Sequence, residues 1–163
     1  MTSTLEINIS IGKQLLEVCN PEGKSLHRYS ISTATNGAGQ LMSSNCTPTG
    51  RHIIRAKIGD GEPINTVFRG RRPTGEVYQK GMREAEPHRD WILTRILWLS
   101  GCEPGFNRLK NVDTMRRYVY IHGTPDEVPM GTPGSHGCIR MRNHELLTLY
   151  DLVCAGTPVT IFP

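Results

Sequence analysis

Two short segments of the sequence carry the residue types of nucleophilic catalysis. One is Tyr-Ile-His-Gly-Thr at 120–124, and the other is Gly-Ser-His-Gly-Cys-Ile-Arg-Met at 134–141. A thiol attacks well only as the thiolate, and because the pKa of a free cysteine is about 8.5 it needs a neighbouring base or cation. His122 lies 16 positions before Cys138, at the end of a predicted strand, where a glycine-rich loop can bring the two together. The pattern predicts a Cys138 nucleophile with His122 as its general base.

Glycines on either side of the cysteine shape the expected site. Gly134 and Gly137 have no side chains, so the backbone can bend there and a substrate carbonyl can approach closely. Consecutive backbone amides in such a turn form an oxyanion hole, where loss of one donor costs on the order of 3 kcal/mol of transition-state stabilisation. We therefore expect main-chain donors beside Cys138.

Other interpretations of the same residue types stay open. Cys138 would also suit a buried small residue, and His122, His136 and Cys138 would also suit three zinc ligands, but the sequence has no Cys-x-x-Cys pair and no evident fourth ligand. The five cysteines are odd in number and widely spaced, which favours reduced thiols. We expect structural roles for the remaining cysteines, with Cys46 the first candidate for an exception, and surface positions for the remaining histidines: Cys19, Cys46, Cys102 and Cys154; His27, His52, His88 and His144.

The elements that must position these residues are mostly strands. Alternating or turn-bounded apolar runs predict strands at Leu5–Ile11, Gln14–Cys19, Leu26–Thr33, Arg51–Ile58, Trp91–Leu99, Arg117–His122 and Val159–Phe162. The first three should form an antiparallel meander. One helix is expected late in the chain, with Asn143 as N-cap and Gly156 and Pro158 after its end. Residues 34–50 form a loop, and the composition of 59–90 suits a lid. We predict one mostly β domain over residues 1–163.

Composition narrows the class of protein further. The net charge of +4 is mild for a nucleic-acid-binding protein. The run Arg69-Gly70-Arg71-Arg72 is expected to be a solvated loop, while Trp91 and Trp98 are expected to fill the core. The first residues lack the cationic and apolar regions of a secretory signal, and no apolar run approaches the roughly 20 residues of a membrane span. These features predict a cytoplasmic protein with neither nucleic-acid nor membrane partners.

Ser-His-Gly-Cys with an upstream His-Gly-Thr and a Thr-Pro-Thr-Gly turn at 47–50 resembles the L,D-transpeptidase catalytic domain, or YkuD, family. The resemblance implies a β-sandwich of mixed strands with one C-terminal helix and room for a second short one. It also implies that the Gly123 carbonyl orients His122 and that the amides of His136, Gly137 and Cys138 form the oxyanion hole. Further substrate contacts are expected from Tyr120, Ser135 and Arg140, the last at a position where some members carry Asn.

The family acts on peptidoglycan tetrapeptide stems, at the bond between meso-diaminopimelate and the terminal D-Ala. The resemblance therefore implies a Cys thioester, no cofactor and no metal, and acylation by carbapenems. Our first expectation is an L,D-carboxypeptidase that releases D-Ala in cytoplasmic murein recycling. The alternatives are an L,D-transpeptidase that forms 3→3 cross-links and, from another class, a peptidoglycan-binding module without catalysis. A stem carries several carboxylates, which suits a chain with 14 Arg among its 19 basic residues.

Overall fold

The first three strands form the predicted antiparallel meander. A computed structural model describes residues 4–163 and gives β1 at Glu6–Ser10, β2 at Leu15–Cys19 and β3 at Ser25–Ser32. Alternation buries every second side chain of β1, so Ile7 and Ile9 point into the core. β2 pairs with both of its neighbours in antiparallel register, and the meander is confirmed.

The remaining strands include the four others that were predicted and three, at 66–69, 72–77 and 139–141, that were not. The strands are β4 Gly50–Ile58, β5 Thr66–Arg69, β6 Arg72–Val77, β7 Ile92–Gly101, β8 Tyr120–Gly123, β9 Ile139–Met141 and β10 Pro158–Phe162. The helices are α1 Met82–Ala85 and α2 Asn143–Leu152, with a 3-10 turn at Lys110–Val112. The predicted mostly β fold, with one C-terminal helix and a second short one, is confirmed.

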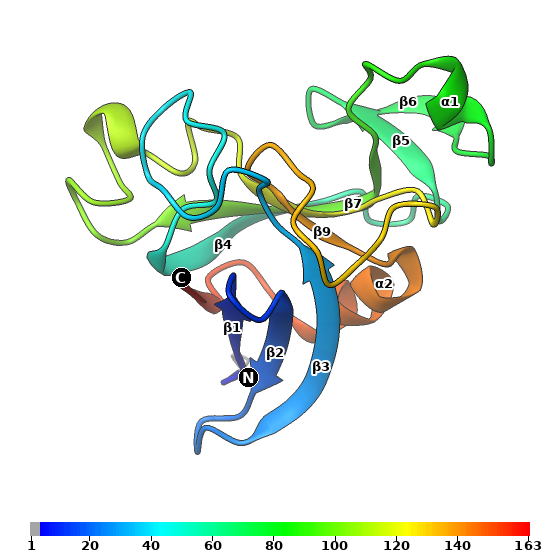
Figure 1. The fold of residues 1–163 in the computed structure, drawn as a ribbon. Coiled ribbons are helices and arrows are strands. Elements are labelled where there is room, and N and C mark those ends of the chain that lie inside the picture. The colour runs from blue at the N-terminus through cyan, green and yellow to red at the C-terminus, as the bar shows by residue number, and fades with distance from the viewer. Residues whose placement is uncertain (1–3) are drawn as a thin grey trace.

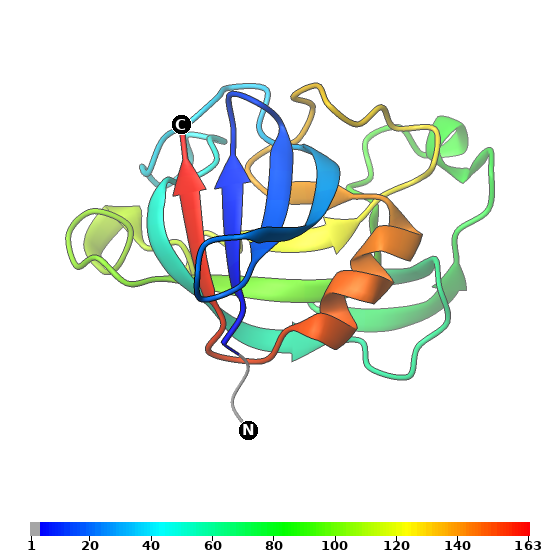
Figure 2. The same ribbon diagram turned by 90° about the horizontal axis from the view of Figure 1, so that it is seen from below.

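The strands close around a single main core (Figure 1). The sheet runs β4-β10-β1-β2-β3-β9-β8-β7, and β4 also pairs with β7, so eight strands complete a ring and the β5–β6 hairpin extends beyond β7. β10 is parallel to β1, as Figure 2 shows, and β9 is parallel to β8, while the other pairs are antiparallel. This mixed arrangement gives the expected sandwich and brings the two segments with predicted catalytic residues together on neighbouring strands.

The C-terminal helix α2 covers one end of this core. Leu146, Leu149 and Tyr150 are buried on one stripe of the helix, as predicted. The prediction that Asn143 is the N-cap was wrong by one residue: Arg142 holds that position, without a side-chain cap hydrogen bond. Asn143 is instead the first helical residue, and its buried amide bonds residues outside the helix. In residues 4–163, no helix has the length and apolar content needed to cross a membrane.

Two other predictions need correction. The strand expected at 117–122 begins only at Tyr120, because Tyr118 takes a left-handed backbone conformation with φ of 56°. His52, expected at the surface, is almost fully buried. Its ring is hydrogen-bonded to the Gly50 carbonyl through Nδ1 and to the Thr114 hydroxyl through Nε2. Both ring nitrogens therefore have hydrogen-bond partners inside the protein.

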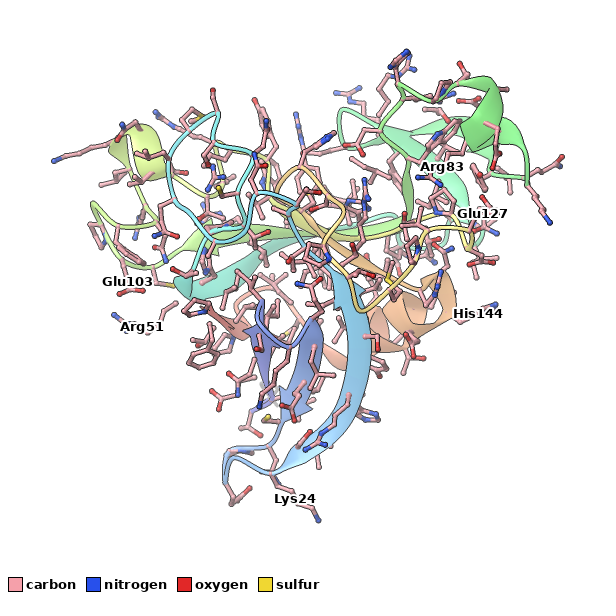
Figure 3. The ribbon with its side chains drawn as sticks, viewed as in Figure 1. Lys24, Arg51, Arg83, Glu103, Glu127 and His144 are labelled. Atoms are coloured by element: carbon pink, nitrogen blue, oxygen red, sulfur yellow. The ribbon has the colours of Figure 1, made fainter. Side chains whose placement is uncertain are left out.

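The segment 59–90, which the sequence pattern did not resolve, forms the β5–β6 hairpin and α1. Tyr78 anchors it: its hydroxyl donates to Glu127 Oε2 at 2.6 Å and accepts from the Arg83 amide. Figure 3 shows Arg83 and Glu127 near each other at this end of the molecule. Burial and the Glu127 carboxylate raise the pKa of Tyr78 to about 12, so this link stays protonated at neutral pH.

Candidate active site

The parallel pairing of β8 with β9 brings the predicted nucleophile and base to one cleft. His122 pairs with Arg140, and Cys138 directly precedes β9, so sulfur and imidazole belong to adjacent strands. Both line a cleft of about 480 Å³. The loop from 124 to 137 makes this possible, because it returns the chain to run β9 in the same direction as β8.

The thiol of Cys138 rests against the backbone of the segment that enters β8. It donates to the Tyr118 carbonyl at 3.4 Å and accepts from the Tyr120 amide at 3.3 Å. Burial raises the pKa of Cys138 to about 12, against the opposing effect of the Tyr120 amide, and the Asp90 carboxylate raises it further. At rest Cys138 is therefore a neutral thiol, and the predicted role as nucleophile requires a base.

His122 has the tautomer and the protonation state that such a base needs. Its Nδ1 lies 2.6 Å from the Gly123 carbonyl oxygen, which can only accept, so Nδ1 carries the proton and Nε2 keeps its lone pair. Burial lowers the pKa of His122, although Asp90 and the Gly123 carbonyl oppose this shift. The imidazole is therefore neutral at neutral pH, with the lone pair on Nε2.

Asn143 fixes the strand end that carries this carbonyl. Its Nδ2 donates to the Thr124 carbonyl at 2.9 Å, and its Oδ1 accepts from Thr94 Oγ at 2.6 Å. A side chain at Gly123 would collide with Asn143 Oδ1 and with the Leu93 carbonyl, so glycine is required there. The sequence pattern predicted a cap role for Asn143, and only its hydrogen bonds to Thr94 and Thr124 show that it supports the site.

The turn before β9 is held from both sides. Ser135 Oγ donates to the Cys138 carbonyl at 2.6 Å and accepts from the Gly137 amide at 3.2 Å. Thr47, from the Thr-Pro-Thr-Gly turn, donates to the Gly137 carbonyl at 3.0 Å. Gly137 has φ of 133°, a conformation that L side chains rarely adopt. His136, the remaining residue of this turn, is exposed and lines the cleft.

These contacts bear on the predicted substrate and oxyanion residues. The Ser135 hydroxyl is already hydrogen-bonded within the turn, and the Gly137 amide donates to Ser135 Oγ in this structure. Tyr120 lines the cleft with its hydroxyl bound to Arg71. An oxyanion hole from residues 136–138 and substrate contacts from Tyr120, Ser135 and Arg140 stay predictions.

Arginines dominate the charge of the cleft. In residues 4–163, its lining has one acidic side chain, Asp90, and four arginines: Arg71, Arg116, Arg117 and Arg140. Arg140 donates to the Gly134 carbonyl at 2.9 Å and faces Asp90 at 4.0 Å. Arg117 donates to the Gly39 and Cys46 carbonyls, so it ties the loop of residues 34–49 to the cleft. The cleft therefore suits an anionic ligand.

Sequence reasoning missed four of these charged residues, Arg71, Asp90, Arg116 and Arg117. Arg71 belongs to the run interpreted as a solvated loop, yet its guanidinium lies 4.9 Å from the Trp98 ring and 4.8 Å from the Tyr118 ring. Asp90, Arg116 and Arg117 belong to no motif, and they lie in the loops before β7 and β8, which the fold places at the cleft. Trp98, expected in the core, is only partly buried and supports Arg71, whereas Trp91 is buried as expected.

A second cavity adjoins the first. It measures about 350 Å³ and shares Asp90, His136 and Arg140 with the main cleft.

Within residues 4–163, no group of three or more His, Cys, Asp or Glu side chains is placed to hold a metal ion. His122 and Cys138 make hydrogen bonds to backbone groups.

Comparisons with known proteins agree with this geometry. An L,D-transpeptidase of Mycobacterium smegmatis superposes with a TM-score of 0.59 at 20% identity, over 99% of this chain and 59% of its own. L,D-transpeptidase 3 of Mycobacterium tuberculosis, solved with a faropenem-derived adduct, gives 0.59 at 16% identity, over 99% and 61%. A YkuD protein of Bacillus licheniformis is 42% identical over 48 residues, 29% of each chain.

This chain thus spans less than two thirds of the length of these relatives, and their structures share its fold. The family model for the L,D-transpeptidase catalytic domain, YkuD, matches residues 4–161, which is nearly the whole sequence. The chain belongs to the L,D-transpeptidase catalytic domain (YkuD) family.

Proposed function

We propose that the protein cleaves the bond between meso-diaminopimelate and D-Ala in peptidoglycan tetrapeptide stems through a thioester on Cys138. One observation carries the proposal: a cysteine and a neutral histidine line one arginine-rich cleft, with the histidine's Nδ1 held by a backbone carbonyl. That carbonyl fills the place of the acidic residue in other catalytic triads.

The reaction begins when the thiol turns from the Tyr118 carbonyl toward the imidazole, a change of side-chain rotamer. His122 Nε2 takes the proton, and sulfur attacks the diaminopimelate carbonyl. Backbone amides of the 136–138 turn stabilise the oxyanion, for which the Gly137 amide must leave Ser135. The imidazolium returns the proton to the departing amine of D-Ala, which leaves a thioester.

Hydrolysis is the outcome that we propose first. Water reaches a half-buried thioester without a dedicated binding site, and its attack through His122 gives a tripeptide and frees Cys138. The expected cytoplasmic role in murein recycling belongs to this proposal, and fractionation of cells that produce the native protein tests it.

Transpeptidation is the second candidate. The adjoining cavity of about 350 Å³ meets the main cleft at Arg140 and His136, where the amine of a second stem would have to enter. An amine that attacks the thioester from that side would give a 3→3 cross-link.

The test is incubation of the protein with a defined tetrapeptide, alone and with an acceptor stem, followed by mass analysis. Tripeptide and free D-Ala support hydrolysis, whereas cross-linked dimer without tripeptide supports transpeptidation. Cys138→Ala should abolish both products and Cys154→Ala, at an exposed cysteine, should not. A wild-type protein that binds the stem without converting it would leave the binding module as the better account.

A further inference from the structure

The tip of the β5–β6 hairpin reaches the cleft through one side chain. Arg69 pairs with Arg72, and the two-residue turn between them has positive φ at both Gly70 and Arg71, 56° and 65°. Such a turn matches the twist of the two strands and fixes the direction of its residues. Arg71 lines the cleft.

Aromatic rings hold the Arg71 guanidinium in place. Its central carbon lies 4.9 Å from the Trp98 ring and 4.8 Å from the Tyr118 ring, and Nη1 donates to the Tyr120 hydroxyl at 3.1 Å. Stacking restrains the planar group before any ligand arrives, so binding loses little side-chain freedom.

Arg71 differs from the other cleft arginines in what its donors do. Arg117 and Arg140 donate to backbone carbonyls of the loops that they support, and Arg116 is exposed with its charge near Asp113. Within residues 4–163, Tyr120 is the one hydrogen-bond acceptor of Arg71. A guanidinium has five N–H donors, so most remain for a ligand in the cleft.

Tyr120 relates this guanidinium to the nucleophile. Its backbone amide contacts Cys138 Sγ, and its hydroxyl, at the far end of the same side chain, contacts Arg71. Tyr120 therefore contacts both the sulfur and the Arg71 guanidinium, at opposite ends of one residue. In the proposed substrate, the carboxylate of the terminal D-Ala is three bonds from the scissile carbonyl carbon, and the distal diaminopimelate carboxylate is six bonds away. Of these two carboxylates, the one on the longer arm suits a guanidinium bound at the far end of the Tyr120 side chain.

Resting on the proposed function, we infer that Arg71 binds the distal carboxylate of diaminopimelate and so selects stems that carry it. The β5–β6 hairpin is then a specificity element that recognises the diaminopimelate side chain of the acyl donor. A stem with lysine at this position, or with the distal carboxylate amidated, lacks the group that Arg71 recognises.

The test compares kcat/KM for the diaminopimelate tetrapeptide and its distal amide in wild type, Arg71→Gln and Arg72→Gln. Arg72 is the matched control, since it is exposed on the same hairpin and does not line the cleft. A lost charged hydrogen bond predicts a preference for the free carboxylate of roughly tenfold to a hundredfold in wild type and Arg72→Gln, and near unity in Arg71→Gln.

The rate of alkylation of Cys138 by neutral iodoacetamide checks that Arg71→Gln keeps its nucleophile, and it should stay within about twofold of wild type. A preference that survives in Arg71→Gln, or one absent from an active wild type, would overturn the assignment. No conversion of either stem by wild type would instead overturn the proposed function, and this assignment with it.

Discussion

The Nδ1 atom of His122 lies 2.6 Å from the carbonyl oxygen of Gly123, the next residue in the chain. A residue that bonds its own neighbour needs no distant partner to set its tautomer. The orientation of the base is therefore built into the last two residues of β8. The remaining support comes from Asn143, which holds Thr124, the residue that follows the strand.

This relationship predicts where activity is lost in acid. Burial lowers the pKa of His122 from its ordinary value of 6.5, so the basic form persists as the pH falls below that value. The acid limb of kcat/KM, measured on a defined tetrapeptide between pH 4 and 8, should lie below 6.5. Because Asp90 raises the pKa of His122, Asp90→Asn should move the limb to still lower pH. A limb above 6.5, or one unchanged in Asp90→Asn, would contradict the role of this imidazole.

Carbapenems should acylate Cys138 without the loss of a leaving group. The ring carbonyl takes the place of the peptide carbonyl, and opening of the ring adds the whole drug, so intact-protein mass should rise by one drug mass. His122→Ala should slow the adduct by at least tenfold, since the thiol with its raised pKa then lacks a base. Peptide mapping locates the adduct, and Cys154→Ser serves as the control at an exposed thiol. An adduct that forms equally in Cys138→Ser would refute the assignment.

Gly137→Ala should lower kcat by more than the accompanying loss of stability explains. At φ of 133° an alanine is strained, and its Cβ would lie 3.3 Å from the Cys46 carbonyl oxygen, so the turn that carries the proposed oxyanion amides would shift. We expect at least a hundredfold lower kcat and about 1–3 kcal/mol of lost stability.

The matched control for that change is Gly131→Ala in the same loop. Its φ is 83°, and the added Cβ would meet nothing within 4 Å, so it carries backbone strain away from the nucleophile. It should lose stability in urea unfolding yet keep its activity. Equal losses of kcat in the two variants would show that the 136–138 turn has no special part in the reaction.

The sequence predicted the elements whose pattern is local. Period-two burial in β1 and the apolar stripe of α2 depend only on neighbouring residues, and both were confirmed. The sequence also predicted that Cys138 and His122 belong to one site, because both lie in short glycine-containing segments, and the structure places both in one cleft.

Contacts between distant segments could not be found in this way. Arg71 follows a glycine in a basic run, and nothing local distinguishes it from a solvated arginine until β5 pairs with β7 and places the hairpin beside Trp98. Asn143 has the residue type of an N-cap, and only the approach of β7 and β8 gives its amide other partners.

The burial of His52 was missed for the same reason, and this burial predicts how the stability of the fold depends on pH. Burial lowers the pKa of His52 to about 4, whereas the unfolded chain should keep a value of about 6.5. The folded state therefore binds fewer protons between these values, and stability falls as the pH drops from 6.5 to 4, by about 3 kcal/mol at its full extent. Urea unfolding followed by tryptophan fluorescence across this range measures the slope.

His52→Gln should be less stable at pH 7 but show a flatter pH dependence, while His27→Gln, at an exposed histidine, should keep the wild-type slope. If the wild-type and His52→Gln curves run parallel, His52 does not titrate on unfolding and the loss in acid belongs to His122 or to the carboxylates.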